Sequence, residues 1–239
     1  MQIIIYICTL MAFFLIGCQS KQQPAQQQQQ SSSTGPANPK REKLAGRLDS
    51  VNNIWIADDK RYEPSGFEGK YASVSRTDSA SGASVIGLIN REGEIVVPIR
   101  YDGIDLGFSN GVNNVVKGDK YGLVNEDGVE VVPVIYRHIG TLVEDSLLRV
   151  SLDGEKFGMI DLQGKVVIPL EYGDVRSVGE GMVAVMKEPQ RWGIMNWKRE
   201  WVHPAVFTFT DRFVNGVVTL QKADGEDYLV YTNGEIKKK

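Results

Sequence analysis

The most constraining feature of this sequence is an internal repeat of about 35 residues. A glycine that follows a large apolar side chain recurs at Gly87, Gly122, Gly158 and Gly193, at intervals of 35, 36 and 35 residues. A period of this length is typical of repeat proteins, in which each small unit buries its apolar face against its neighbours. We therefore expect a tandem array of similar units.

Five further positions keep their character from copy to copy. A large residue precedes the glycine, and an Asn or Asp follows it by three positions. A second glycine follows by six in the first three copies, and Arg199 takes its place in the fourth. A proline comes eleven positions after it and an aromatic residue fourteen. The copies are Ile86, Asn90, Gly93, Pro98 and Tyr101; Tyr121, Asn125, Gly128, Pro133 and Tyr136; Phe157, Asp161, Gly164, Pro169 and Tyr172; and Trp192, Asn196, Arg199, Pro204 and Phe207. A fifth, partial copy covers residues 228–234, with Tyr228 in the place of the glycine.

The spacing within a unit predicts short antiparallel strands. The Asn/Asp-x-x-Gly step fits a tight turn, because the Asx side chain bonds nearby backbone and the glycine takes a positive φ. β-Branched runs such as residues 95–97 and 166–168 follow the turn. We expect the proline to end that strand, because it cannot donate a ladder hydrogen bond. About three strands are predicted for each unit, two of them joined as a hairpin.

The predicted fold class is all-β, with tandem antiparallel β-hairpin or meander repeats that form a twisted open array. A small closed ring of blades, like a propeller, is the alternative. The repeat domain is expected to cover residues 44–239. Its first part, residues 44–69, fits the repeat poorly, and the Ile-Trp-Ile run at residues 54–56 is expected to form a strand or a cap on the first unit.

The first 17 residues are predicted to be a lipoprotein signal peptide. Residues 3–17 are almost all apolar; the run is too short for a spanning helix, which needs roughly 20 residues, but suits a secretory signal. It ends in Leu15-Ile16-Gly17-Cys18, which resembles the lipobox of bacterial lipoproteins. The resemblance implies cleavage before Cys18 and a diacylglycerol on its thiol. An uncleaved anchor or a non-lipidated signal is the alternative, because no Lys or Arg precedes the apolar run.

Residues 18–43 are predicted to be the lipidated Cys18 followed by a flexible tether rich in Gln, Ser and Pro. Such a low-complexity segment buries too little to offset its ordering entropy. Two or three acyl chains hold a protein stably on a membrane, whereas one holds it only marginally. The expected location is therefore the cell envelope, and the absence of an aspartate after Cys18 favours the outer membrane.

Composition argues against several classes of function. Both cysteines, Cys8 and Cys18, precede the repeats, so the repeat domain has no disulfide, no thiolate metal site and no cysteine nucleophile. The net charge of −3 gives no electrostatic basis for binding nucleic acid. The sequence holds no P-loop, dinucleotide fingerprint or G-x-S-x-G motif. We expect no cofactor, no metal and no enzyme activity.

Two sets of polar residues are interpreted as structural. His138 and His203 occupy different places in the repeat, and His203 fills a strand position that is apolar in the other units. Asp127 and Asp153 each precede a glycine and are interpreted as turn residues, because an EF-hand needs a far denser set of oxygen ligands. A Ser-His-Asp arrangement stays open as an alternative for the histidines.

Two columns of aromatic residues recur once per unit. The first comprises Tyr101, Tyr136, Tyr172 and Phe207, and the second comprises Tyr121, Phe157 and Trp192. Rings with this recurrence are interpreted as the core between units. A groove for sugars or peptides is the alternative.

The steps Arg191-Trp192-Gly193, Lys120-Tyr121-Gly122 and Lys156-Phe157-Gly158 resemble the WG-repeat (KWG-repeat) family, which is common in exported bacterial proteins. The resemblance covers about residues 71–236, and residues 157–169 fit its pattern best. It implies no defined activity. The expected function is a non-catalytic binding or scaffold module of the envelope, with an envelope protein or a polysaccharide as partner. A passive spacer and an uncharacterised hydrolase are the alternatives.

Overall fold

The computed structural model describes residues 41–143 and 146–239, which lie in the compact unit Asn38–Lys239. Its described elements are β-strands, without an α-helix and without any helix long and apolar enough to cross a membrane. The expected signal peptide, Cys18 and the tether up to residue 40 lie outside the described residues. The attachment of lipid to Cys18 therefore stays a prediction.

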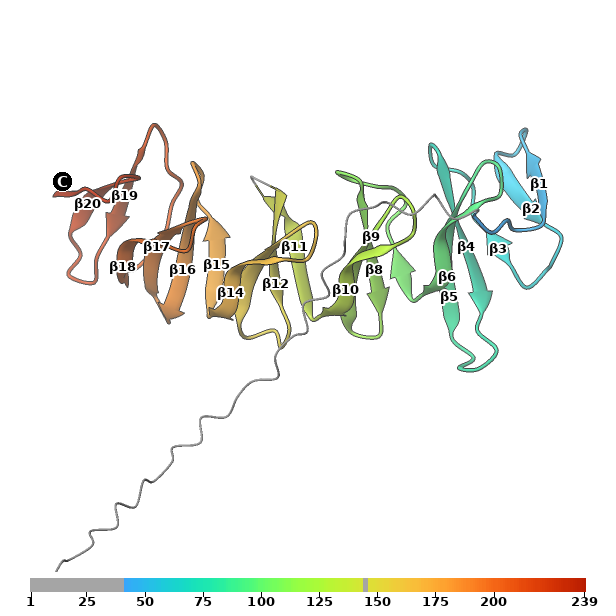
Figure 1. The fold of residues 1–239 in the computed structure, drawn as a ribbon, viewed down its shortest axis with the longest axis horizontal. Coiled ribbons are helices and arrows are strands. Elements are labelled where there is room, and N and C mark those ends of the chain that lie inside the picture. Colours follow the sequence, from blue (N-terminus) through green and yellow to red (C-terminus); the bar gives the residue numbers. More distant parts are fainter. Residues whose placement is uncertain (1–40, 144–145) are drawn as a thin grey trace, which may run out of the picture. The chain divides into compact units, whose positions relative to one another are not determined.

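The described strands form six antiparallel sheets in chain order (Figure 1). The N-terminal hairpin pairs β1 with β2, and two four-stranded sheets, named units I and II, follow it. The bounds are β1 (Gly46–Asp49) and β2 (Ile54–Ala57); unit I, β3 (Glu63–Pro64), β4 (Tyr71–Thr77), β5 (Ser84–Asn90) and β6 (Ile95–Tyr101); unit II, β7 (Gly103–Ile104), β8 (Val112–Lys117), β9 (Lys120–Asn125) and β10 (Glu130–Tyr136).

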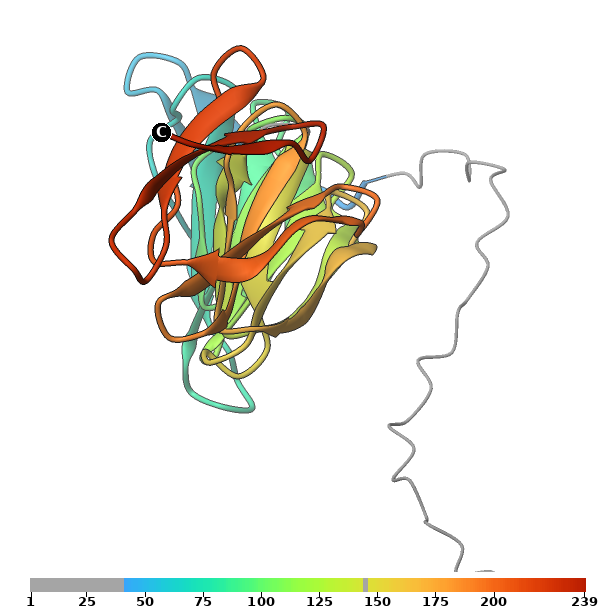
Figure 2. The same ribbon diagram turned by 90° about the vertical axis from the view of Figure 1, so that its left-hand side faces the viewer.

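Two further four-stranded sheets, units III and IV, and a three-stranded C-terminal sheet complete the row. The bounds are unit III, β11 (His138–Val143), β12 (Leu147–Ser151), β13 (Phe157–Asp161) and β14 (Val166–Tyr172); unit IV, β15 (Asp174–Ser177), β16 (Met182–Glu188), β17 (Arg191–Asn196) and β18 (Trp201–Phe207); C-terminal sheet, β19 (Val217–Gln221), β20 (Asp227–Tyr231) and β21 (Ile236–Lys238). Figure 2 views this row from its C-terminal end.

The all-β class and the open tandem array are confirmed. Each unit is a meander whose strands pair in sequence order, and none of the described sheets closes into a barrel. The N-terminal hairpin and the C-terminal sheet lie at opposite ends of the row in Figure 1, so the alternative of a closed ring is not formed. Each unit holds four strands, not three. The first strand varies in length between units, from two residues in β3 and β7 to six in β11, so it leaves no common sequence pattern.

The prediction that the proline ends a strand is wrong, because each proline lies inside the fourth strand of its unit. In unit III, Phe157 pairs with Tyr172 and Met159 pairs with Ile168, so residues 169–171 bulge opposite Gly158 alone. A Cβ on Gly158 would lie 2.5 Å from the Ile168 carbonyl oxygen and 2.7 Å from the carbonyl carbon of the following proline. The repeat glycine is therefore needed for close passage of the bulged strand.

The predicted Asx turn is confirmed. In unit II, Asn125 Oδ1 accepts hydrogen bonds from the backbone N–H groups of Asp127 and Val129, both at 3.0 Å, and Gly128 has a φ of 73°. Arg199 takes this place in unit IV with a φ of 67°. Its guanidinium donates to the carbonyl oxygens of residues 166 and 167 at 2.5 and 2.7 Å, so the turn of unit IV is bonded to the fourth strand of unit III.

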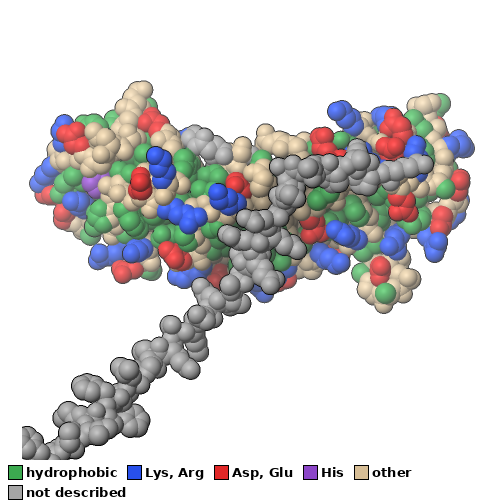
Figure 3. Space-filling model, viewed as in Figure 1, with side chains coloured by type: hydrophobic (Ala, Val, Ile, Leu, Met, Phe, Trp, Pro, Cys, Tyr) green, Lys and Arg blue, Asp and Glu red, His purple; other side chains and the backbone are tan. Residues whose placement is uncertain are grey.

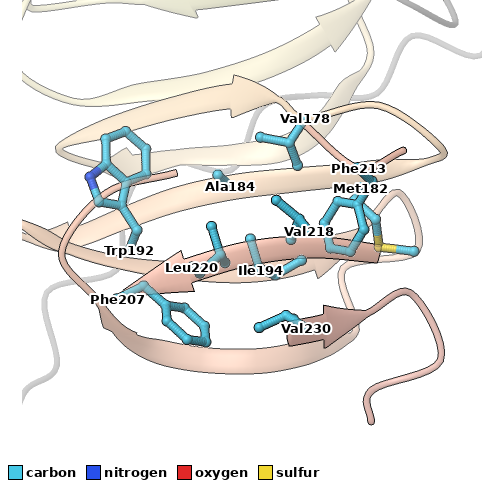
Figure 4. Packing of buried hydrophobic residues seen from close by; sticks show 10 residues of the cluster. All are labelled: Val178, Met182, Ala184, Trp192, Ile194, Phe207, Phe213, Val218, Leu220 and Val230. Carbon is cyan, nitrogen blue, oxygen red and sulfur yellow. The ribbon is translucent and has the colours of Figure 1, made fainter. Parts of the chain in front are cut away.

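The core is divided among the junctions between neighbouring sheets. Each junction has its own apolar cluster, and Figure 4 shows the one between unit IV and the C-terminal sheet. The first aromatic column lies in these clusters, which confirms its interpretation as core. The exposed fractions are 0% for Tyr101, 6% for Tyr136, 5% for Tyr172 and 0% for Phe207.

The ends of the row differ from its middle. Trp55 in β2 is buried in a cluster with residues of unit I, which confirms the predicted strand and cap. In the C-terminal sheet, Thr219 and Asp227 take the positions that Ala184 and Trp192 hold in unit IV. They alternate with the buried Val218, Leu220 and Val230, so they point away from unit IV. This outer face is therefore more polar than the internal ones.

Candidate functional site

His203 is held as a structural residue. It is 9% exposed, and its ring packs edge-on against Phe207 with 5.9 Å between the centroids. Burial lowers the pKa of His203, and hydrogen bonding to the backbone at Gly234 and Glu235 opposes this shift. The structure brings no carboxylate of the described residues into hydrogen-bond contact with it, so it lacks the partner of a catalytic triad.

His138 belongs to a charged cluster at the junction of units III and IV. Its Nε2 lies 3.0 Å from Arg149 Nη1, and burial followed by the charge of Arg149 lowers the pKa of His138. Arg149 donates to Asp174 Oδ1 from Nε at 2.8 Å and from Nη2 at 2.7 Å, and Arg176 donates to Asp174 Oδ2 at 2.9 Å. No local sequence pattern indicates this cluster, because its members come from different units.

The second aromatic column does not behave as one set. The Arg149 guanidinium lies 3.6 Å from the centroid of Phe157, and that of Arg176 lies 4.7 Å from the Trp192 ring. These two rings are thus covered by cations, and one of the two, Arg149, also bonds unit III to unit IV. Tyr121 is 40% exposed, and among the described residues no cation covers it. Its interpretation as a core residue is wrong.

The junction of units II and III is open where the next one is filled. Asn114 pairs with Leu123 as Arg149 pairs with Met159, so Asn114 is the counterpart of Arg149. Two cavities of about 440 and 260 Å³ lie here, and both are lined by Asp105, Asn114 and Gly140. Tyr121 lines the second cavity. We name this site, defined by Asp105, Asn114, Tyr121 and Gly140, the II–III hollow.

A buried asparagine shapes the II–III hollow. Asn113 is 2% exposed. Its Nδ2 donates to the carbonyl oxygens of Asp105 and Gly107 at 2.8 and 2.6 Å, and its Oδ1 accepts from the Asp105 N–H at 3.2 Å. The equivalent positions in units I, III and IV are the apolar residues Ala72, Leu148 and Val183. A buried amide is tolerated because it is hydrogen-bonded, and here it fixes the loop that carries Asp105.

The side chains of the hollow combine polar and apolar chemistry. Asp105 Oδ2 accepts a hydrogen bond from Asn114 Nδ2 at 2.7 Å, and both residues are exposed. Val116 and Ile139 lie beside the Tyr121 ring in the wall of the second cavity. One signal in the sequence could have indicated the hollow: Asn113-Asn114 interrupts a strand where the other units are apolar at the first of these positions.

The remaining acidic candidates behave as turn residues. Asp153 Oδ1 accepts from the backbone N–H groups of Glu155 and Lys156 at 2.7 and 2.8 Å, and these bonds lower the pKa of Asp153. Asp127 pairs with Arg41 at 3.2 Å. Within residues 41–143 and 146–239, no three His, Cys, Asp or Glu side chains are grouped as for a metal. Basic and acidic side chains are intermixed on the face in Figure 3.

Comparison with known proteins supports the repeat assignment. A family model described as "WG containing repeat" matches residues 86–121, 121–155 and 157–188. These segments span parts of units I to IV, so this stretch consists of three WG-containing repeats. No curated protein matches the chain in a sequence comparison.

Solved structures resemble the fold at low sequence identity. A structure described as a eukaryotic initiation factor is 9% identical, with 78% of this chain and 55% of that chain covered and a TM-score of 0.43. Hsv2p of Kluyveromyces lactis is 11% identical, with 74% and 63% covered and a TM-score of 0.36. The chain thus spans 55% and 63% of the lengths of these two proteins.

Proposed function

We propose that this chain is an exported lipoprotein, anchored through an acylated Cys18, whose WG-containing repeats form a non-catalytic binding module of the cell envelope. The observation that carries the binding role is the II–III hollow, which stays open although the neighbouring junction is filled by Arg149. The lipobox-like run ending at Cys18 supports the anchor. A random coil of about 25 residues between Cys18 and the repeats would span roughly 25–30 Å, enough to hold the repeats clear of the lipid surface.

The histidines give no support for a hydrolase. A general base needs to lie within hydrogen-bond reach of a nucleophile and to be oriented by a third group. His138 contacts an arginine whose own partner is Asp174, and His203 is buried against a ring. We therefore propose no catalytic role for either residue.

The anchor is tested by labelling bacteria that express the full chain with an alkyne analogue of palmitate. The wild type and Cys8→Ala are expected to carry the label and to fractionate with membranes, because Cys8 lies inside the removed signal. Cys18→Ala is expected to lose both the label and processing. Label retained by Cys18→Ala would contradict the proposed anchor.

The binding role is tested by site-directed crosslinking in cells. A benzophenone amino acid replaces Tyr121 at the hollow or, as a matched control, the equally exposed Phe209 (40% and 43%). We expect adducts from position 121 and not from position 209. A passive spacer predicts no adduct at either position, and that result would reject a binding role.

A further inference from the structure

We propose that the II–III hollow binds a neutral pyranose unit of an oligosaccharide. Asp105 and Asn114 would hydrogen-bond its hydroxyl groups, and Tyr121 would pack on the apolar C–H face of the ring. The proposal rests on the binding function proposed above and names its ligand class. It follows from the shape of the hollow, its polar pair and its exposed ring.

The hollow has the size of a small-ligand site. Its larger cavity of about 440 Å³ falls in the range of roughly 300–1,000 Å³ that is usual for such sites. The space exists because Asn114 is shorter than its counterpart Arg149. Unit III contributes the backbone of Gly140 to the wall of the hollow. At the next junction Arg149 crosses to Asp174 and occupies the space.

The polar pair is matched to hydroxyl groups. A carboxylate only accepts hydrogen bonds, whereas an amide both donates and accepts them. Adjacent sugar hydroxyls also donate and accept, so one of them can donate to Asp105 while its neighbour bonds to Asn114. An anion is repelled by the carboxylate. The pair therefore favours a polyol over an anionic ligand.

The pair is held in place before a ligand arrives. Asn113 fixes the backbone at Asp105 and Gly107 through three hydrogen bonds, and the bond from Asn114 fixes the carboxylate. Such preorganisation reduces the entropy cost of binding. The residues equivalent to Asn113 in the other units are apolar, and an amide packs no better than they do. Its role is therefore to hold the loop that carries Asp105.

The apolar side of the hollow suits the apolar face of a sugar ring. The Tyr121 ring is 40% exposed and borders the cavity beside Val116 and Ile139. An aromatic face next to a polar pair suits a ligand that has an apolar face and a hydroxyl-rich edge, as a pyranose does. The rings of Phe157 and Trp192 are covered by arginines, so they offer no equivalent surface.

Binding is measured with the full chain in a zwitterionic detergent that carries no sugar. Isothermal titration uses cellotetraose and chitotetraose as neutral probes and a galacturonate tetramer as an anionic one. We expect a Kd for at least one neutral probe in the millimolar range or below. The anionic probe is expected to bind at least about tenfold more weakly, which corresponds to about 1.4 kcal/mol.

Two variants test the location. Asn114→Arg is expected to abolish binding, because the longer side chain fills the space as its counterpart Arg149 does at the next junction. Tyr121→Ala is expected to weaken binding at least about tenfold, against no change for Phe209→Ala, and it serves if Asn114→Arg does not fold.

Three results would overturn the proposal. They are no binding of either neutral probe, undiminished binding by folded Asn114→Arg and Tyr121→Ala, and a preference for the anionic tetramer. Oligosaccharide binding without label on Cys18 would contradict the envelope anchor and leave this ligand assignment standing. Label and crosslinks without oligosaccharide binding would reject the ligand class and leave the proposed function standing.

Discussion

Replacing Gly158 by alanine should destabilise the repeat array by about 2–3 kcal/mol. The new Cβ would lie 2.5 Å from the Ile168 carbonyl oxygen and 2.7 Å from the carbonyl atoms of Pro169, where an ordinary contact needs about 3.4 Å. Both obstacles are backbone atoms of a bulged strand, so no side-chain rotation relieves them. Overpacking of this kind costs typically 1–3 kcal/mol. Because the backbone of the bulged strand cannot shift to make room, we place the cost of Gly158→Ala at about 3 kcal/mol, the upper end of this range.

The unfolded chain reduces this cost slightly. Alanine has less backbone freedom than glycine, which stabilises a protein by about 0.4–1 kcal/mol where the native φ allows it. Gly158 does not have a positive φ, so this gain applies. Gly140→Ala gains the same entropy but meets only contacts of 3.4 Å or more, and it should change stability by less than about 0.5 kcal/mol.

Urea denaturation of the full chain, followed by circular dichroism and tryptophan fluorescence, measures the difference. Hydrogen exchange across residues 147–172 checks whether unit III opens before the other units, since repeat arrays need not unfold in one step. If Gly158→Ala is as stable as Gly140→Ala, the bulged strand does not require the glycine, and close passage of that strand is not the reason for the repeated aromatic-glycine step.

Three further outcomes are expected. Arg149→Met should lower the free energy of unfolding by about 1–2 kcal/mol, because Asp174, whose side chain is 13% exposed, loses two of its hydrogen bonds. A double-mutant cycle that combines it with Asp174→Asn should show a coupling energy above about 0.5 kcal/mol. Because burial lowers the pKa of His203, the unfolded chain binds more protons, and stability should fall as the pH drops below about 6.5; His203→Val should flatten that slope in urea titrations. The double substitution of Thr219→Ala and Asp227→Trp should make the outer face of the C-terminal sheet apolar and cause concentration-dependent association in light scattering, which a monodisperse variant would contradict.

Local chemistry predicts the parts of the fold that are set within one unit. The Asx turn depends on Asn125 and Gly128, which lie three residues apart, so the spacing alone predicts it. The array of units follows from a period too short for independent domains, whereas its open form is seen only in the structure. The bulge is not predictable in this way, because a proline such as Pro98 suits either a strand end or a bulge, and only the partner strand decides between them. Pairing across strands is not visible in a local pattern.

The candidate site could not be predicted because it depends on differences between junctions. Repeats emphasise what is shared, and the shared positions build the core. Arg149 and Asp174 are 25 residues apart and meet only because unit IV stacks on unit III. The repeat pattern predicts a core position for Tyr121 because it aligns with Trp192, which is buried; the exposure of Tyr121 follows from the short side chain of Asn114 nearby.

In this array a hollow opens between two units where one of them departs from the others. Its strands repeat one backbone, so any junction of similar side chains closes like its neighbours. Unit II departs twice, with the buried Asn113 in place of an apolar residue and with Asn114 where unit III has arginine. Asn114 leaves space at the junction with unit III, and Asn113 holds the loop that carries Asp105 beside that space. Arg199, the departure in unit IV, instead adds bonds to its neighbour. Departures that open a junction are therefore the residues to examine for function, and those that strengthen one are the residues to examine for stability.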